Sequence, residues 1–193
     1  MDNSVNPSVP ASNLKLYTVF SLDKEEYASS VDNIIEIVEN LPITPVPRSL
    51  EFVLGIINLR GKIIPIIDLE KKFELTHESD TVPKHILIVE VNKIKFAVQV
   101  DEVKEVIKLR DDDIKPVPST ITNKISEKYL KGVYIQTENN QEEEKRGEIK
   151  NERIILILDF NRLFEVSDLK ESLNVANEKN LPEGGVKNEG PDS

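Results

Sequence analysis

The residue types that perform most enzyme chemistry are scarce in this sequence. It contains no cysteine, which excludes thiolate metal ligands, cysteine nucleophiles and disulfide bonds. Its two histidines, His77 and His85, stand at no spacing typical of paired metal ligands. Its seven glycines form no phosphate-binding loop, nucleophile elbow or dinucleotide fingerprint. The sequence therefore predicts no catalytic residue, no metal and no cofactor, and it indicates that the protein is not an enzyme.

Two charged segments have a second interpretation. The carboxylates of Asp111, Asp112 and Asp113 are consecutive, but they lack the glycine-centred spacing of a calcium loop, so a solvated turn is preferred to a cation site. The segment "EEEKR" at 142–146 is interpreted as a solvated loop, with a docking element as the alternative.

Composition limits the remaining classes of function. The 193 residues are 38% hydrophobic, which is enough for one or two small domains. The net charge of -10 disfavours nucleic-acid binding, which needs a basic groove with stacking aromatic residues. No apolar run approaches the roughly 18 to 20 residues of a membrane span, and the first residues do not resemble a signal peptide. We therefore expect a soluble cytoplasmic protein that does not insert into a membrane.

The chain contains an internal repeat. Residues 19–38 align with 88–107 at a constant offset of 69, which pairs Tyr27 with Phe96, Val31 with Val100, Asp32 with Asp101 and Glu36 with Glu105. Further along, Gly55 aligns with Gly132 at an offset of 77, and Asp68 aligns with Asp159 at an offset of 91. The difference, 91 − 77 = 14 residues, predicts an insertion in the second copy, and the polar segment 136–152 is its expected position.

Each copy is expected to form about five short strands. The segments are rich in β-branched residues and contain apolar runs of five or more, which indicates strands that are buried on both faces or line a barrel. Barrel closure removes the exposed edges of a five-stranded sheet, so two small barrels are predicted. Asp68 and Asp159 are expected to cap short helices, and "SLEFVL" at 49–54 is expected to be a short helix.

These patterns divide the chain into four parts. The first barrel is expected at 14–83 and the second at 84–166, with the acidic insertion at 136–152. Residues 1–13 and 167–193 are expected to be disordered, apart from a possible helix at "DLKESLNV".

One charged residue stands out in the hairpin "NLRGKIIPIIDL", residues 58–69. Gly61 is expected to supply a positive φ at the turn. Arg60 has no basic counterpart in the second copy, where Thr137 stands at the matching position (137 − 60 = 77), so the barrel itself does not require it. Arg60 is then either an exposed charge that keeps the loop soluble or a functional contact.

The motifs together resemble a known family. "EEYASSVDNIIEIV", "EFVLGIINLRG", "NLRGKIIPIIDL", "VDEVKEVIKL", "YLKGVYI" and "RIILILDFNRLF" are similar, in this order over residues 14–166, to the CheW family of bacterial chemotaxis coupling proteins. The resemblance implies a mainly β fold of two five-stranded SH3-like β-barrels packed together, with short helices. It also implies a non-enzymatic scaffold that couples the cytoplasmic hairpin of chemoreceptors to the regulatory domain of the histidine kinase CheA, in arrays near the membrane. A related module, from CheA itself or from a receiver-fused adaptor, remains the nearest alternative.

The resemblance also implies where the partners bind. The receptor-binding residues would be Ile34, Glu36, Asn58, Arg60 and Gly61, with an ion pair between Arg60 and Glu36. The kinase-binding residues would be Gly55, Ile86, Val103 and Val106. Two alternatives stay open: Ile34 is a core residue instead of a receptor contact, and Gly55 either allows a close backbone approach or ends the expected helix at 49–54.

Overall fold

The computed structural model describes residues 14–39, 41–75, 83, 85–118, 125, 127–137 and 152–163. The expected disordered ends, the "DLKESLNV" helix, His77 and all but the edges of the 136–152 insertion lie outside these residues.

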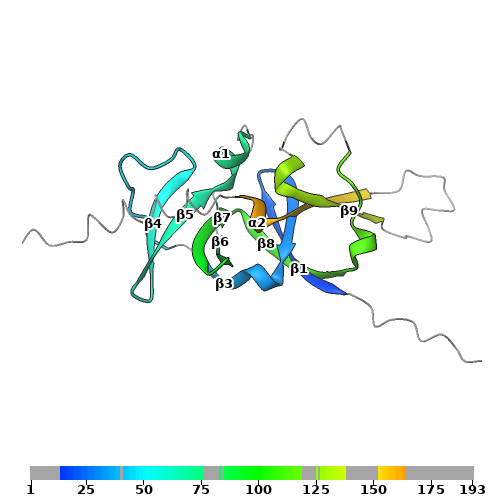
Figure 1. Cartoon of the computed structure of the whole chain (residues 1–193), viewed down its shortest axis with the longest axis horizontal. Coiled ribbons are helices and arrows are strands. Elements are labelled where there is room, and N and C mark those ends of the chain that lie inside the picture. Colours follow the sequence, from blue (N-terminus) through cyan, green and yellow to red (C-terminus); the bar gives the residue numbers. More distant parts are fainter. Residues whose placement is uncertain are drawn as a thin grey trace, which may run out of the picture.

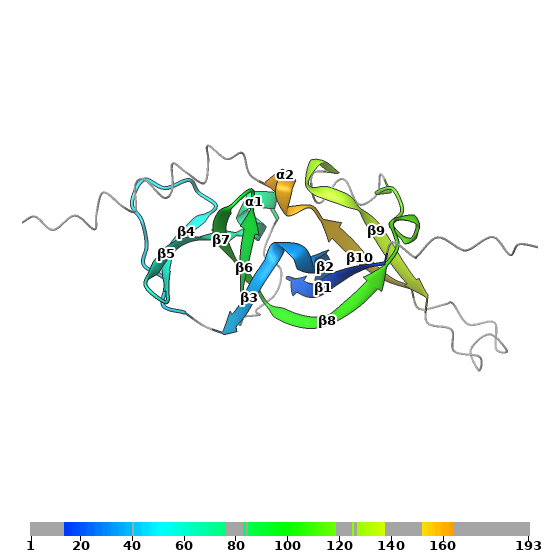
Figure 2. The same ribbon diagram turned by 60° about the horizontal axis from the view of Figure 1, so that its bottom comes forward.

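In these described residues, ten strands form two five-stranded sheets, each curved into a barrel (Figures 1 and 2). Barrel A has the strand order β8-β1-β2-β10-β9 and barrel B the order β3-β6-β7-β5-β4. The strands of barrel A are β1 (Lys15–Leu22), β2 (Glu25–Ser30), β8 (Glu102–Leu109), β9 (Leu130–Thr137) and β10 (Glu152–Leu158). Those of barrel B are β3 (Ile34–Glu39), β4 (Val53–Leu59), β5 (Lys62–Asp68), β6 (His85–Val91) and β7 (Ile94–Val100). The expected fold class is confirmed.

The barrels do not follow the expected division of the chain at residue 83. Barrel A combines β1 and β2 of the first copy with β8, β9 and β10 of the second, and barrel B combines the remaining strands in the same way. The chain passes from barrel A to barrel B at η1 (Val31–Asn33) and returns at Asp101, which is the same position in the two copies. The third strand of each copy pairs with the first strand of the other copy, β3 with β6 and β8 with β1, so 14–83 and 84–166 are repeats and not barrels.

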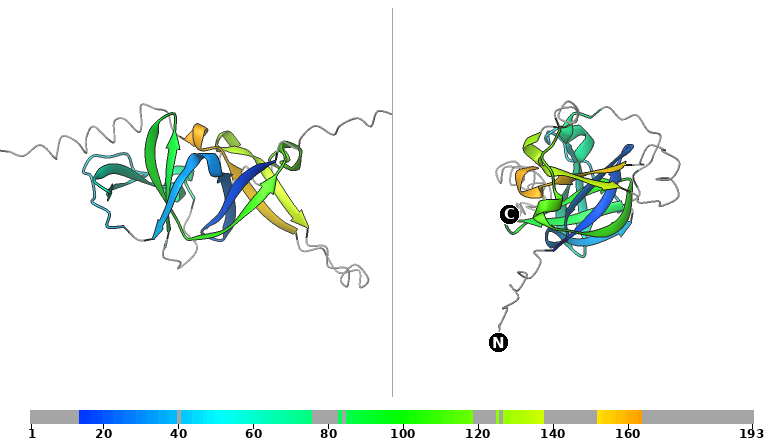
Figure 3. Two further views of the ribbon diagram at one scale, coloured as in Figure 1. Left: turned by 90° about the horizontal axis from the view of Figure 1, so that it is seen from below. Right: turned by 90° about the vertical axis from the view of Figure 1, so that its right-hand side faces the viewer.

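Three apolar cores explain the long apolar runs in the sequence. Each barrel encloses a small core, and a larger central cluster lies where the barrels pack together, so many strands are buried on both faces. The barrels lie side by side along the long axis of the molecule (Figure 3). The core of barrel A contains Tyr17, Val19, Ala28, Leu109, Ile155 and Ile157, and that of barrel B contains Ile57, Ile64, Ile66, Ile86, Ile88 and Ala97.

Two short helices complete the central cluster. α1 (Leu69–Phe73) and α2 (Phe160–Leu163) each follow the last strand of a copy and bury their apolar residues in this cluster. Asp68 Oδ1 accepts a hydrogen bond from the Lys71 amide at 3.1 Å, and Asp159 Oδ1 accepts one from the Asn161 amide at 3.0 Å. Both aspartates therefore satisfy amides at the start of a helix, as the sequence predicts.

Each barrel closes at one close approach between two backbones. Thr44, after β3, pairs with Ile56 of β4, and Lys115, after β8, pairs with Val133 of β9. A Cβ atom on Gly55 would lie 2.3 Å from the Thr44 carbonyl oxygen, and one on Gly132 would lie 2.4 Å from that of Lys115. The repeated glycines therefore permit closure, because no side chain fits at either seam. The expected helix at 49–54 is wrong: residues 51–52 form a turn and β4 begins at Val53, so Gly55 lies inside a strand.

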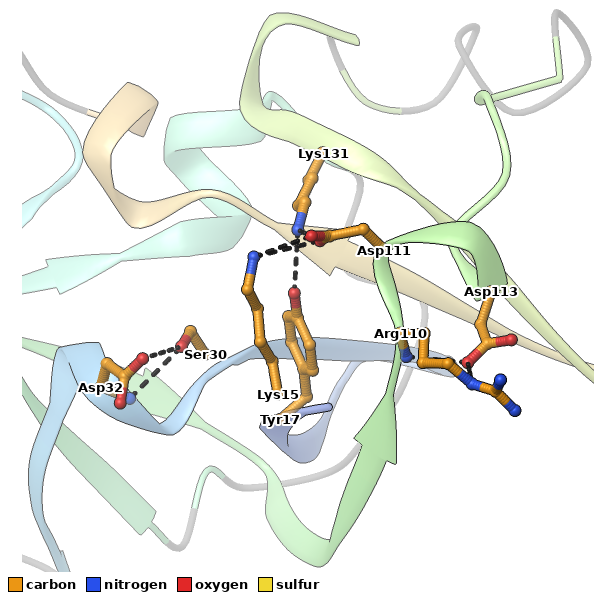
Figure 4. Close-up of polar contacts among 8 residues, drawn as sticks. All are labelled: Lys15, Tyr17, Ser30, Asp32, Arg110, Asp111, Asp113 and Lys131. Carbon is orange, nitrogen blue, oxygen red and sulfur yellow. Dashed lines mark hydrogen bonds and ion pairs between the residues drawn. The ribbon is translucent and has the colours of Figure 1, made fainter. Parts of the chain in front are cut away.

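A small ion cluster holds the end of barrel A near its seam (Figure 4). Asp111, in the short η2 helix (Asp111–Asp113), lies between the ammonium groups of Lys15 at 2.9 Å and Lys131 at 2.7 Å. Lys131 also donates to the Tyr17 hydroxyl at 3.0 Å. Hydrogen bonds from Lys131 and Lys15 lower the pKa of the Asp111 carboxyl to about 2. This carboxylate therefore joins β1, η2 and β9 through two lysines.

We expect Gly132→Ala to lower the free energy of unfolding by about 1–3 kcal/mol, because the new methyl group overlaps the Lys115 carbonyl and must push the seam apart. Urea denaturation followed by circular dichroism measures the change. Thr137→Ala, at an exposed position of the same strand, is the control and should stay within about 0.5 kcal/mol of the parent. Equal midpoints for the two variants would show that closure does not need the glycine.

We expect the Asp111 carboxyl to titrate near pH 2 in the parent and closer to 3.8 in Lys131→Ala, which removes the stronger of its two donors. Since the folded-state pKa lies below the ordinary value, the stabilisation by this ion cluster is complete above about pH 4 and is lost as the pH falls through 2. Carbon-detected NMR of the carboxyl group measures both values. A parent pKa near 3.8 would contradict the ion cluster.

Candidate functional site

The β4–β5 hairpin turns at Arg60 and Gly61. Both residues have positive φ, +53° and +81°, and Leu59 pairs with Lys62 across the turn. The Asn58 side-chain oxygen accepts a hydrogen bond from the Gly61 amide at 2.8 Å, which fixes this conformation. Two-residue turns of this kind favour Asn, Asp or Gly at the first position, so an arginine there carries backbone strain. The expected positive φ at Gly61 is confirmed.

Arg60 reaches across the barrel seam to Glu36. Its Nη2 atom donates to Glu36 Oε1 at 2.6 Å, so the pair links the β4–β5 turn to β3, the strand at the other end of the sheet. The Arg60 side chain is 78% exposed, whereas that of Glu36 is 25% exposed. Among the described residues, Glu36 is the only polar partner of Arg60, and it uses one of the three guanidinium nitrogens. The remaining donors face solvent and are available to a carboxylate of another molecule.

The isoleucines of β3 lie on opposite faces of the strand, and Ile34, the expected receptor contact, is not the exposed one. Ile34 is partly buried against the central cluster, which favours its interpretation as a core residue. The neighbouring Ile35 and Ile37 point the other way and are 48% and 43% exposed. The sequence analysis missed these two isoleucines. Side chains alternate between the two faces of a strand, so residues on either side of an inward-facing Glu36 must face outward. This alternation was the signal that could have identified Ile35 and Ile37.

The second copy contains an ion pair at the equivalent glutamate. Glu105 accepts from Arg153 Nη1 at 2.5 Å, and Arg153 also contacts Glu26 and Gln136. Although burial opposes its ionisation, hydrogen bonds from Arg153 and Lys104 lower the pKa of Glu26 below its usual value. The comparison of Arg60 with Thr137 was incomplete, because the arginine that reaches Glu105 in barrel A comes from β10 and not from a hairpin tip.

The two arginines differ in availability. Arg153 is 28% exposed and is shared by three acceptors on three other strands, as expected of a structural residue. Arg60 is 78% exposed and has a single acceptor. The exposed pair in barrel B is therefore the better candidate for an interaction with another molecule.

The four expected kinase-binding residues do not form one surface. Gly55 is buried at the seam, and Ile86 is 2% exposed inside barrel B, so a partner can reach neither residue. Val103 is partly buried against the central cluster. Val106 is 55% exposed on β8. It is the repeat equivalent of Ile37, since 106 − 37 = 69.

The described part of the chain contains no group of three or more side chains arranged to hold a metal ion. His85 lies at the start of β6, where Nδ1 is 3.5 Å from the Asp101 carbonyl oxygen. Neither α1 nor α2, the α-helices within the described ranges, is long enough to cross a membrane.

Comparison with known proteins agrees with this architecture. Residues 16–168 match the family model of the CheW-like domain. The chain is 38% identical over 104 residues to the chemotaxis protein CheW of Helicobacter pylori, covering 54% of this chain and 63% of that relative. It is 31% identical over 155 residues to the chemotaxis protein CheW of Thermotoga maritima, covering 80% and 90% of the two chains.

A solved structure has the same fold. The scaffolding protein TtCheW from Thermoanaerobacter tengcongensis superposes with a TM-score of 0.65 at 32% identity, over 84% of this chain and 94% of the other. The family match extends over strands of both interleaved barrels, from β1 to beyond β10. The chain therefore belongs to the CheW-like domain family.

Proposed function

We propose that this protein is a non-enzymatic chemotaxis adaptor that couples the cytoplasmic hairpin of chemoreceptors to the regulatory domain of the histidine kinase CheA. The observation that carries the proposal is the Arg60–Glu36 pair at the seam of barrel B, in which the Arg60 side chain is 78% exposed. Names of relatives, a chemotaxis protein in one case and a scaffolding protein in another, support the same role. The protein would act in the cytoplasm, at receptor arrays.

The receptor contact would combine one charge with two apolar side chains. Arg60 has guanidinium donors left that suit a carboxylate, and Ile35 and Ile37 present an apolar strip on the outer face of β3, the face opposite to Glu36. An amphipathic helix with an acidic residue beside its apolar face complements this arrangement. Glu36 and Asn58 would then act by orienting Arg60, the first through the ion pair and the second through the turn.

The kinase contact would use the equivalent strand of barrel A. Val106 is the exposed member of the expected set, and it occupies on β8 the place that Ile37 occupies on β3. One adaptor would thus present the same strand position twice, with different side chains. This difference lets one chain select two partners.

We expect Arg60→Glu to weaken receptor binding by at least about tenfold, or about 1.4 kcal/mol, because the new carboxylate repels both Glu36 and an acidic receptor residue. Stability should change by no more than about 1 kcal/mol, since the pair is exposed. Co-purification with a receptor hairpin and with the kinase regulatory domain measures both contacts. Lys62→Glu, the same charge change two residues along the hairpin, is the matched control. Loss of kinase binding, or unchanged receptor binding, would count against the assignment.

We expect Ile35→Ser combined with Ile37→Ser to abolish receptor co-purification while leaving the urea midpoint near that of the parent, because both side chains are largely exposed. Ile34→Ala should do the reverse: it should lower the free energy of unfolding by about 1–2 kcal/mol and retain receptor binding. Receptor binding that is lost in Ile34→Ala and kept in the double variant would assign the contact to the inner face instead.

A further inference from the structure

The edge strand β8 of barrel A is held differently on its two sides. One side pairs with β1 along the whole of Glu102–Leu109. The other side is the end of the sheet, and β8 forms the lower edge of barrel A in Figure 2. Among the described residues, the backbone bridge that closes this side joins Lys115 to Val133, and Lys115 lies ten residues after Glu105 (115 − 105 = 10). The first half of β8 is therefore held on this side by side chains.

Four charged side chains form a network at this end of barrel A. Arg153 of β10 donates from Nη1 to Glu105 of β8 at 2.5 Å and from Nε to Glu26 of β2. Lys104 of β8 donates to the same Glu26 at 2.5 Å. Glu105 lies two residues before Ile107, which packs against the core of barrel A, so the Glu105 side chain points to the inner side of the barrel. The network therefore closes the end of the barrel above its apolar core.

Arg153 connects more strands than any other member of this network. Its acceptors lie on β8, on β2 and, through Gln136 at 3.2 Å, on β9. In the strand order β8-β1-β2-β10-β9, β2 and β10 are interior strands, whereas β8 is an edge. A planar guanidinium directs its donors in a fixed geometry, which a flexible ammonium group does not. Arg153 therefore anchors the edge strand to the middle of the sheet.

The residue after Glu105 is Val106, the exposed member of the expected kinase-binding set. Successive side chains of a strand point to opposite faces, so a contact that fixes Glu105 inward also sets the outward direction of Val106. The arrangement recurs in barrel B, where Arg60 contacts Glu36 and the exposed Ile37 follows. In both barrels, an arginine thus holds the residue next to an outward-facing apolar side chain.

We propose that Arg153 is a positioning residue for kinase binding. It holds Glu105 from across the open side of barrel A, and so keeps β8 and Val106 in the orientation that the kinase regulatory domain contacts. The inference rests on the proposed adaptor function and adds to it a residue that acts through β8 without touching the partner.

The first test needs no partner. Arg153→Gln removes the charge and the link to Glu105, and amide hydrogen exchange measured by NMR compares this variant with the parent. We expect the β8 amides to exchange at least about fivefold faster, because the strand opens locally, while the β3 amides keep the parent rate. Arg48→Gln, the same change at an exposed loop position before β4, is the matched control and should alter neither strand. A uniform increase in both barrels, or unchanged β8 rates, would overturn the positioning role.

The second test measures affinity for both partners. Arg153→Gln should weaken binding of the kinase regulatory domain by about three- to tenfold and leave receptor binding at the parent level, because only β8 is displaced. Glu105→Ala should cause a similar loss, and the double variant should lose no more than either single variant, since both residues act through one contact. Arg153→Lys, which keeps the charge and one donor, should recover part of the kinase binding.

Three results would overturn the inference: equal loss of receptor and kinase binding, additive losses in the double variant, or loss in Glu105→Ala alone. The last result would make Glu105 itself the kinase contact. The proposed function can fail separately. A parent chain that binds no kinase domain would contradict the adaptor role, whereas hydrogen exchange would still decide whether Arg153 holds β8.

Discussion

The close approach of two backbones at each barrel seam is the constraint on which the rest of the structure depends. Thr44 meets β4 beside Gly55, and Lys115 meets β9 beside Gly132, at separations that leave no space for a Cβ atom. Closure of barrel B brings the first and last strands of its sheet together, and only then can an arginine on the β4–β5 turn reach a glutamate on β3. The surface pair is thus a consequence of backbone packing. The ion pair itself adds at most about 1 kcal/mol to stability.

Duplication explains why the two barrels use the same position differently. Glu36 and Glu105 are repeat equivalents, and each accepts from an arginine that reaches it from across the barrel. In barrel A the arginine lies inside a strand and donates to several acceptors, so its donors are used in hydrogen bonds within the protein. In barrel B the arginine lies at a strained turn, exposed and with one acceptor. In one copy the interaction is part of the packed structure, and in the other the guanidinium keeps donors exposed to solvent.

Local features could be predicted from the sequence, whereas the long-range pairing of strands could not. Repeat offsets, β-branched runs and capping aspartates predict ten strands, two closed sheets and the helices after Asp68 and Asp159, because each depends on neighbouring residues. Periodicity does not predict that the copies interleave. β3 and β8 would bury the same faces whether they paired with a strand of their own copy or with one of the other copy. Burial of Ile86 depends on that pairing and was therefore missed, whereas the outward direction of Ile35 and Ile37 was available from alternation.

Interleaving also determines how rigidly the two barrels are held relative to each other. Because η1 and Asp101 each connect a strand of one barrel directly to a strand of the other, the barrels are joined by two short covalent crossings. The central cluster contains 20 buried residues, against six in each barrel core, so separating the barrels would expose more apolar surface than opening either one. The faces on β3 and β8 are therefore fixed relative to each other by the largest core in the protein. A scaffold that must set the geometry between two bound proteins needs this property, whereas two barrels on a flexible linker would bind both partners without orienting them.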